Sequence, residues 1–163
     1  NTDIKHLEAL VGKAKANAST FIDTAKESLN IISEKSNILI LRSARSWMIQ
    51  SMIEVMNEYR NISIDLLGQD AITEELKSNP GVNNNYSYGD GFFSTNTIDS
   101  HLIEKLNNNA YDFILLPMAN NHLDGYRNVV EVAQLIEPKF ILGVYPEGNT
   151  RLIEQKKGAK VLM

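Results

Sequence analysis

The stretch that decides the fold is residues 111–128, YDFILLPMANNHLDGYRN. Its first part, residues 111–117, is a continuous apolar run, which is typical of a strand buried on both faces of a parallel sheet. A polar loop follows, and a helical pattern resumes around Tyr126. A strand that ends in a polar loop and returns through a helix is the unit of an open α/β sheet. Such sheets bind ligands outside the carboxyl ends of their strands. The stretch therefore predicts a fold class and the place of a binding site.

The same alternation of strand and helix continues through the chain from residue 37 onward. It predicts strands at 37–42, 61–68, around Tyr86 and Tyr88, 111–117, 139–145 and, last, 159–162. It predicts helices at 47–59, 70–77, 98–106 with Asn96 or Thr97 as N-cap, and 126–136. Because the connections are short, we expect a single open, mainly parallel Rossmann-like α/β sheet with helices on both faces. The expected strand order is 3-2-1-4-5, which puts the strands at 37–42 and 111–117 side by side at the switch point.

Residues 1–35 are predicted to form a long helix ahead of an α/β domain at 36–163. Seam positions recur there at intervals of three and four residues and are apolar except for Ser28. The apolar members of the seam are Ile4, Leu7, Val11, Ala14, Ala18, Phe21, Ala25 and Ile32. Two interpretations stay open. The helix joins chains as a coiled coil, which would make a homo-oligomer, or it packs as an amphipathic helix on its own domain.

The composition narrows the classes of function. The chain has 163 residues, a net charge of −4 and no cysteine. The acidic balance argues against non-specific binding of nucleic acid or anionic membrane. Without cysteine there is no disulfide or thiolate chemistry, and the scattered His6, His101 and His122 form no metal-binding pair, so we expect no metal site. No apolar run approaches the roughly 20 residues that span a bilayer, so we expect no membrane span and a cytoplasmic location.

Polar residues follow the first strand of the switch point. Ser43 and Ser46 offer hydroxyl groups next to the free amides at the start of the next helix, where anions bind. Arg45, together with Arg42, adds groups that pair with phosphate or carboxylate. The segment therefore predicts an anion site. The alternative is that the serines cap the helix and the arginines pair with nearby acidic residues.

The loop after the strand at 111–117 is unusually rich in hydrogen-bonding groups. They include Asn120, Asn121, His122, Asp124 and Arg127. Loops on rigid strands are where binding groups concentrate, so we expect ligand contacts here, with Arg127 holding an anion and Asp124 or His122 placed to act as a base. No catalytic residue is assigned. The alternative is turn chemistry, with Asp124 capping the helix and Arg127 pairing with Glu131.

Glu147 follows the next strand, in the segment YPEGN. An acidic residue at the carboxyl end of a strand is placed to meet a ribose or sugar hydroxyl, although a simple turn also explains it. The chain lacks both the GxGxxG dinucleotide fingerprint and the GxxxxGK[ST] P-loop, which weakens the case for a nucleotide-binding enzyme of either type.

With these strands placed, the chain resembles the N-terminal Rossmann-like domain of glycosyltransferase family 9, the heptosyltransferase type. The similar segments are 37–42, 62–68 and 111–117, and the resemblance covers roughly residues 37–145. It implies a nucleotide-sugar ligand. The family has Gly-Asp after the first strand's arginine, with the Asp as base, whereas this chain has Ser43, Ala44 and Arg45. It also uses a second Rossmann domain, for which this sequence has no room, so no catalytic residue carries over.

The leading hypothesis is therefore a glycosyltransferase-like accessory or partial domain from surface-glycan biosynthesis. It would bind a sugar or phosphate-bearing ligand at the carboxyl edge of the sheet and would not be a complete enzyme alone. One alternative is a non-catalytic oligomerisation or interaction module that uses the N-terminal helix. Another is a small enzyme that binds a nucleotide or S-adenosylmethionine.

Overall fold

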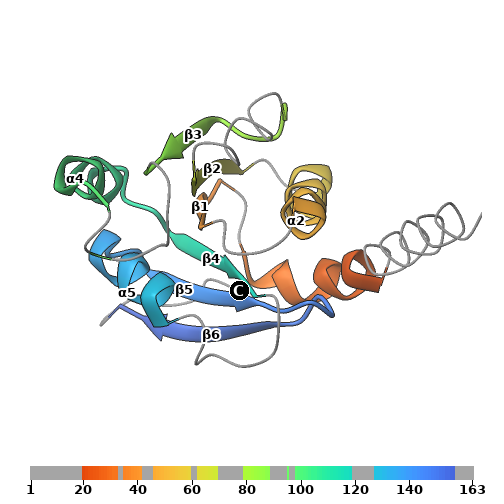
Figure 1. Ribbon diagram of the computed structural model, residues 1–163. Helices are drawn as coiled ribbons and strands as arrows, with labels where there is room; N and C mark the ends of the chain where they lie inside the picture. Colours follow the sequence, from red (N-terminus) through yellow and green to blue (C-terminus); the bar gives the residue numbers. More distant parts are fainter. Residues whose placement is uncertain are drawn as a thin grey trace, which may run out of the picture.

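The computed structural model describes residues 20–32, 35–41, 46–59, 62–69, 79–88, 95, 98–118 and 127–156. Within them, helices lie on both faces of one sheet (Figure 1). The strand order is β3-β2-β1-β4-β5-β6. The strands are β1 Asn37–Leu41, β2 Ser63–Gly68, β3 Asn84–Ser87, β4 Phe113–Pro117, β5 Phe140–Val144 and β6 Thr150–Gln155.

The first five strands are parallel, so the predicted Rossmann-like order 3-2-1-4-5 is confirmed. Strands β1, β2, β4 and β5 are buried over nearly their whole length, as their apolar runs indicated. The edge strand expected around Tyr86 is β3, whose side chains are partly or fully exposed.

The last strand differs from the prediction. We expected it at 159–162, which lies outside the described residues, and the structure has β6 at Thr150–Gln155, antiparallel to β5. The reason is a tight reversal after β5, in which the Gly148 amide donates to the Tyr145 carbonyl at 2.9 Å. Gly148 has φ +95°, a backbone conformation that residues with a side chain rarely adopt. The chain therefore turns back at once as a hairpin.

The helices are α2 Ser46–Tyr59, α4 Ser100–Asn108 and α5 Arg127–Ile136. The predicted helices at 47–59 and 126–136 are confirmed, and the one predicted at 70–77 lies outside the described residues. The cap predicted for α4 is wrong. The helix begins two residues later than expected, and the side chain of Asp99 accepts from the amide of His101 at 2.8 Å. Ile98, expected in the first turn, is instead buried just before the cap.

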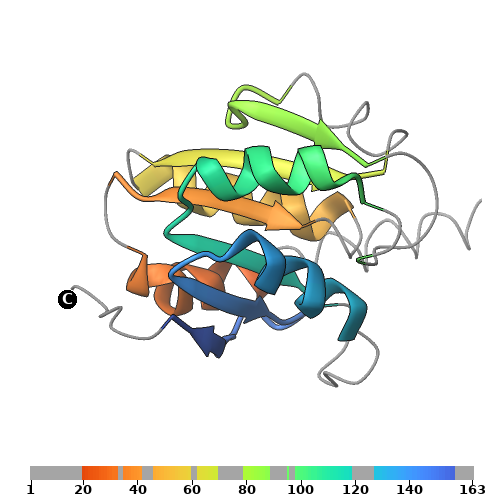
Figure 2. The same cartoon turned by 90° about the vertical axis from the view of Figure 1, so that its left-hand side faces the viewer.

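Each face of the sheet has its own core because successive side chains of a buried strand alternate between the faces. The first face is covered by α2 and the N-terminal helix, and the second by α4 and α5 (Figure 2). The strand residues of the first face are Ile38, Ile40, Ile64, Leu66, Phe113, Leu115, Phe140, Leu142 and Val144. Those of the second face are Leu39, Leu41, Leu67, Ile114, Leu116 and Ile141.

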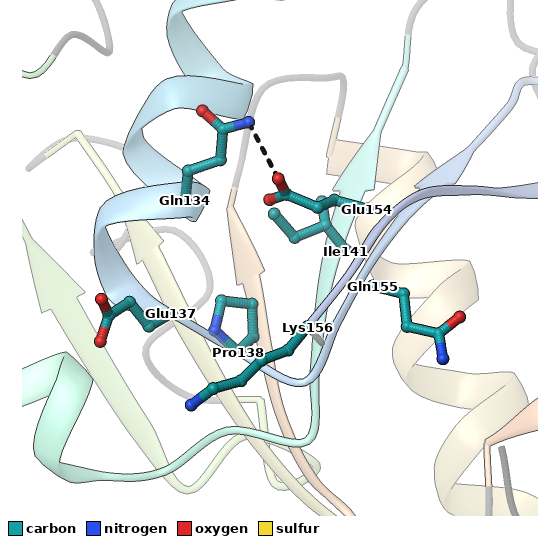
Figure 3. Close-up of a pocket in the computed structure, with 7 residues that line it drawn as sticks. All are labelled: Gln134, Glu137, Pro138, Ile141, Glu154, Gln155 and Lys156. Atoms are coloured by element: carbon teal, nitrogen blue, oxygen red, sulfur yellow. Dashed lines mark hydrogen bonds between the residues drawn. The ribbon is translucent and has the colours of Figure 1, made fainter. Parts of the chain in front are cut away.

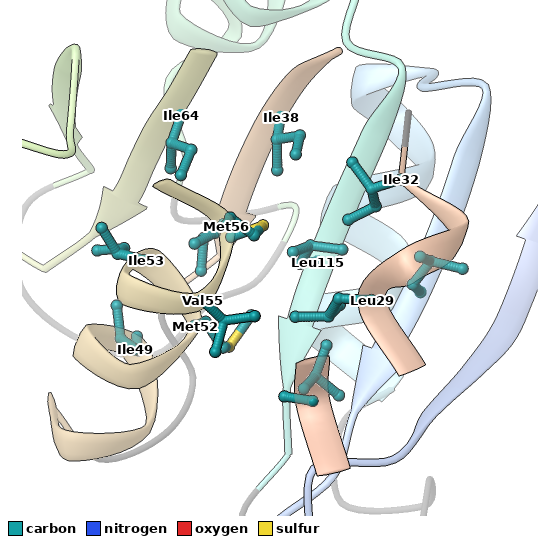
Figure 4. Packing of buried hydrophobic residues seen from close by; sticks show 14 of the residues in the cluster. Leu29, Ile32, Ile38, Ile49, Met52, Ile53, Val55, Met56, Ile64 and Leu115 are labelled. Carbon is teal, nitrogen blue, oxygen red and sulfur yellow. The ribbon is translucent and has the colours of Figure 1, made fainter. Parts of the chain in front are cut away.

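The N-terminal helix, described from residue 20, packs on its own sheet. It is α-helical through residue 28 and closes with the 3-10 turn η1, Leu29–Ile31. Phe21, Ala25, Leu29 and Ile32 are buried, and Figure 4 shows Leu29 and Ile32 directed toward Leu115 of β4. For residues 20–32 the docked interpretation is therefore the one that the structure shows.

One detail of the N-terminal prediction was wrong. The helix does not continue to residue 35, because Ile32 already has an extended backbone. Leu29, which lies outside the seam, is also buried and widens the apolar stripe. The seam positions upstream of residue 20 lie outside the described residues.

Candidate functional site

The switch point lies between β1 and β4. These strands pair in parallel, with Ile38 opposite Phe113 and Ile40 opposite Leu115, so their carboxyl ends lie side by side. From there the chain leaves to opposite faces of the sheet. Helix α2 starts at Ser46 on the first face, and α5 starts at Arg127 on the second (Figure 2). Open α/β sheets bind ligands at such a point.

The two segments that follow β1 and β4 in the sequence carry most of the predicted ligand-binding residues. Ser43, Arg45, Asn120, Asn121 and Asp124 all lie outside the described residues. Ser46 is the first residue of α2, and its side chain is likewise outside the description. Their contacts with a ligand therefore remain predictions, whereas the structure does place the strand ends and helix starts that flank both loops.

Arg127 is the first residue of α5 and points into solvent. Its side chain is 86% exposed, and its Nε lies 3.8 Å from Oε1 of Glu131, one helical turn on. The alternative of a local ion pair with Glu131 is thus what the structure shows. Exposed pairs of this kind contribute roughly 0–1 kcal/mol to stability. The guanidinium therefore remains available to an incoming anion at little cost.

Glu147 is exposed in the turn between β5 and β6, at the carboxyl edge of the sheet. The alternative of a simple turn is correct locally, since the amide of Tyr145 donates to the carbonyl of Asn149 at 2.9 Å. The side-chain Oδ1 of Asn149, like that of Asn85, is buried and has no hydrogen-bond donor within the described part of the chain. Buried acceptors normally have a donor, so in that part of the chain this acceptor beside Glu147 is unsatisfied.

Sequence reasoning missed Arg151, the second residue of β6. Its guanidinium carbon lies 5.0 Å from the centre of the Tyr145 ring. The ring folds back over Gly143, where a Cβ would lie 3.2 Å from the Tyr145 hydroxyl oxygen. Arg151 is exposed and pairs in register with Gly143. Only the register of the hairpin brings these residues together, so no local sequence signal pointed to them.

Arg127 is the first residue of α5, and Arg151 is the second residue of the neighbouring strand β6. Farther along those elements, Gln134 of α5 donates to Glu154 of β6 at 3.5 Å. A helix rises about 1.5 Å per residue and a strand about 3.3 Å. Each arginine therefore lies about 10 Å from this contact, toward the carboxyl edge. Two exposed cationic side chains thus approach the same edge as the switch point.

A second polar cluster lies at the opposite, amino edge. Asp65 of β2 is buried. Its carboxylate accepts hydrogen bonds from the hydroxyl of Tyr111 at 2.7 Å and from the side-chain amide of Asn84 at 3.2 Å. The side-chain amide of Asn109 donates to the hydroxyls of Tyr111 and Tyr86 at 3.0 and 3.3 Å. Burial, and then the bond to Asp65, raises the pKa of Tyr111 far above its ordinary value. These hydrogen bonds connect β3 and the end of α4 to β2 and to Tyr111 ahead of β4.

Asp112 forms a further connection at the amino edge. Its Oδ2 accepts from the backbone amide of Asn37, the first residue of β1, at 2.8 Å. Its Oδ1 lies 3.0 Å from Nζ of Lys139, which precedes β5. The carboxylate therefore aligns the starts of β1, β4 and β5, which is a structural role.

A pocket of about 320 Å³ also opens at the amino edge, between the end of α5 and β6 (Figure 3). It is lined by Gln134, Glu137, Pro138, Ile141, Glu154, Gln155 and Lys156. Its acidic and basic groups are exposed, and it lies at the end of the sheet opposite the switch point. The described residues contain no cluster of three or more His, Asp or Glu side chains suited to a metal ion.

The comparisons with known proteins identify no family for this chain. No protein-family model and no curated protein matches it. Among solved structures, the human synaptic vesicle membrane protein VAT-1 homolog-like protein aligns with a TM-score of 0.42 and 11% identity. The alignment covers 77% of this chain and 38% of that one, and it is too loose to transfer residues. In the described residues, no helix is both long and apolar enough to cross a membrane.

Proposed function

We propose that this domain binds a phosphate- or sugar-bearing small molecule in the crevice between the loops that follow β1 and β4. The observation that carries the proposal is the parallel pairing of β1 with β4, from which α2 and α5 leave to opposite faces. Ligands of open α/β sheets bind at such a point. The exposed Arg127 and Arg151 at the same edge favour an anionic group on the ligand.

The finer form of the proposal is a glycosyltransferase-like accessory or partial domain of a surface-glycan biosynthesis protein, with a nucleotide sugar as ligand. Its support is the resemblance of the strands at the switch point to the N-terminal domain of glycosyltransferase family 9. Because the segment after β1 lacks that family's Gly-Asp pair, the domain is proposed to bind the ligand without catalysing transfer alone.

A thermal-shift screen tests this proposal. The purified protein is heated with nucleotide sugars, nucleotides, S-adenosylmethionine or inorganic phosphate at millimolar concentration. A ligand that binds only the folded protein raises the midpoint by mass action. We expect a nucleotide sugar or nucleoside diphosphate to raise it, and Arg45→Ala or Arg127→Ala to reduce that shift. S-adenosylmethionine as the sole active compound would point to the small-enzyme alternative.

Lys156→Ala is the matched control for the arginine variants. It removes the same charge from an exposed residue, but just after the carboxyl end of β6, which lies at the amino edge of the sheet. We expect the ligand-induced shift in this variant to equal that of the unmodified protein. No shift with any compound would overturn the proposal and favour the non-catalytic interaction module.

A further inference from the structure

The N-terminal helix reaches the start of α2. Phe21 is fully buried, and its ring meets the ring of Trp47 edge-on, with centroids 5.8 Å apart and planes at 89°. Trp47 is the second residue of α2 and is half-buried. Since α2 begins directly after the loop from β1, Phe21 packs against the part of this helix that is nearest to the switch point.

The same helix also supports the turn between β5 and β6. A Cβ on Gly148 would lie 2.4 Å from the Phe21 carbonyl oxygen and 2.9 Å from the Ala25 amide nitrogen. The hydroxyl of Ser28 donates to the Gly148 carbonyl, and the hydroxyl of Thr150 donates to the Ser28 carbonyl at 3.0 Å. The turn that carries Glu147 therefore rests on the backbone of the N-terminal helix, with no room for a side chain between them.

We propose that the N-terminal helix is a positioning element for the switch-point site, with Phe21 and Gly148 as its positioning residues. It holds the start of α2 and the turn after β5 in one fixed arrangement. The ligand part of this inference rests on the proposed function. If the arrangement is the one that binds ligand, docking of the helix and binding of ligand stabilise each other, and this coupling is reciprocal.

The first test needs no ligand. Gly148→Ala places a methyl group against the helix backbone and requires φ +95° of an alanine, so it should loosen the helix from the turn. We expect faster hydrogen exchange at residues 20–28 and in the first turn of α2, together with altered emission from Trp47, the single tryptophan of the chain.

Gly143→Ala is the control, because the atoms nearest to its Cβ would be side-chain atoms of Ile153 and Tyr145, at 3.1–3.3 Å, and not helix backbone. It should leave exchange in α2 and at residues 20–28 unchanged. Should Gly148→Ala fail to fold, Phe21→Leu replaces it, since leucine keeps an apolar side chain but removes the ring contact with Trp47. Exchange in the first turn of α2 that stays at the level of the unmodified protein in the folded variant would overturn the proposal.

The second test uses UDP as the probe. Under reciprocal coupling, UDP slows hydrogen exchange at residues 20–28 as well as at the switch point, and Gly148→Ala binds UDP about tenfold more weakly. Protection at the switch point without protection at 20–28 contradicts the positioning role and leaves the proposed function intact. No binding of UDP or of any screened compound contradicts the proposed function, and the first test then decides the positioning role alone.

Discussion

The two edges of the sheet differ in how their polar groups are used. At the amino edge, polar side chains are hydrogen-bonded within the protein. Tyr111 bonds to Asp65 and Asn109, and Asp112 bonds to the backbone amide at the start of β1. At the carboxyl edge, Arg127, Glu147 and Arg151 are exposed. Polar groups that already have partners within the protein stabilise the fold, whereas exposed groups at the carboxyl edge are available to a ligand. We therefore expect substitutions of the bonded groups at the amino edge to change stability and leave ligand binding intact. Substitutions of the exposed groups at the carboxyl edge should weaken ligand binding with little effect on stability.

The largest effect is expected from Asp65→Ala. The substitution leaves the buried hydroxyl of Tyr111 and the amide of Asn84 without their acceptor. A buried group that loses its partner costs about 1–3 kcal/mol, and chemical denaturation should show a loss of this size. Ligand-induced thermal shifts should remain. A folded variant that no longer binds ligand would break the division between the edges.

A smaller and pH-dependent effect is expected from Tyr111→Phe. Burial raises the pKa of Tyr111 above its ordinary value of 10.0, so the folded protein keeps a proton that the unfolded chain releases. The stability due to this group is therefore fully present below pH 10.0 and is lost as the pH rises above it. Denaturation between pH 8 and pH 11 should show a flatter decline in the variant. Parallel curves would contradict the predicted linkage.

Ala110→Gly is expected to stabilise the protein. Ala110 precedes β4 at the amino edge with φ +54°, a left-handed conformation that glycine adopts without a Cβ penalty. We expect a gain of up to about 1 kcal/mol in the free energy of unfolding. Ala133→Gly, inside α5 and fully buried, is the matched control and should be destabilising. Loss of stability in both variants would show that the left-handed backbone carries no strain.

Arg127→Ala should have the smallest effect on stability. Its pair with Glu131 is 3.8 Å long and largely exposed, so the change in unfolding free energy should stay within about 0.5 kcal/mol. The variant should nevertheless bind a nucleoside diphosphate more weakly in calorimetry. Glu131→Gln, which removes the partner and keeps the arginine, should bind at least as well as the unmodified protein.

Much of the fold could be predicted because its strands are continuous apolar runs. Residues 37–41, 113–117 and 140–144 contain few polar side chains, and burial on both faces leaves one interpretation. Strand β6 has no such run, because Arg151 and Glu154 interrupt it. The cap of α4 was predicted at Asn96 or Thr97, which are residue types that suit a cap, whereas the cap in the structure is Asp99. Burial of Ile98, a tertiary effect, selects Asp99.

The strand order, and with it the carboxyl edge where we expect the candidate site, could be predicted from the sequence, whereas the ligand contacts stay predictions. The switch-point rule located the edge, and Arg127 and Glu147 do lie exposed along it. Arg151 could not be found, because its place over Tyr145 depends on the hairpin register and on the missing side chain of Gly143. The contact of Phe21 with Trp47 likewise depends on where the N-terminal helix docks.

Hydrogen exchange measured with and without a saturating ligand from the thermal-shift screen tests most directly whether the ligand binds at the switch point. We predict slower exchange in the first turns of α2 and α5 and at the ends of β1 and β4, with exchange around Asp65 and Asp112 changed no more than the gain in global stability requires. Protection centred on the amino edge, or on the pocket between α5 and β6, would contradict binding at the switch point.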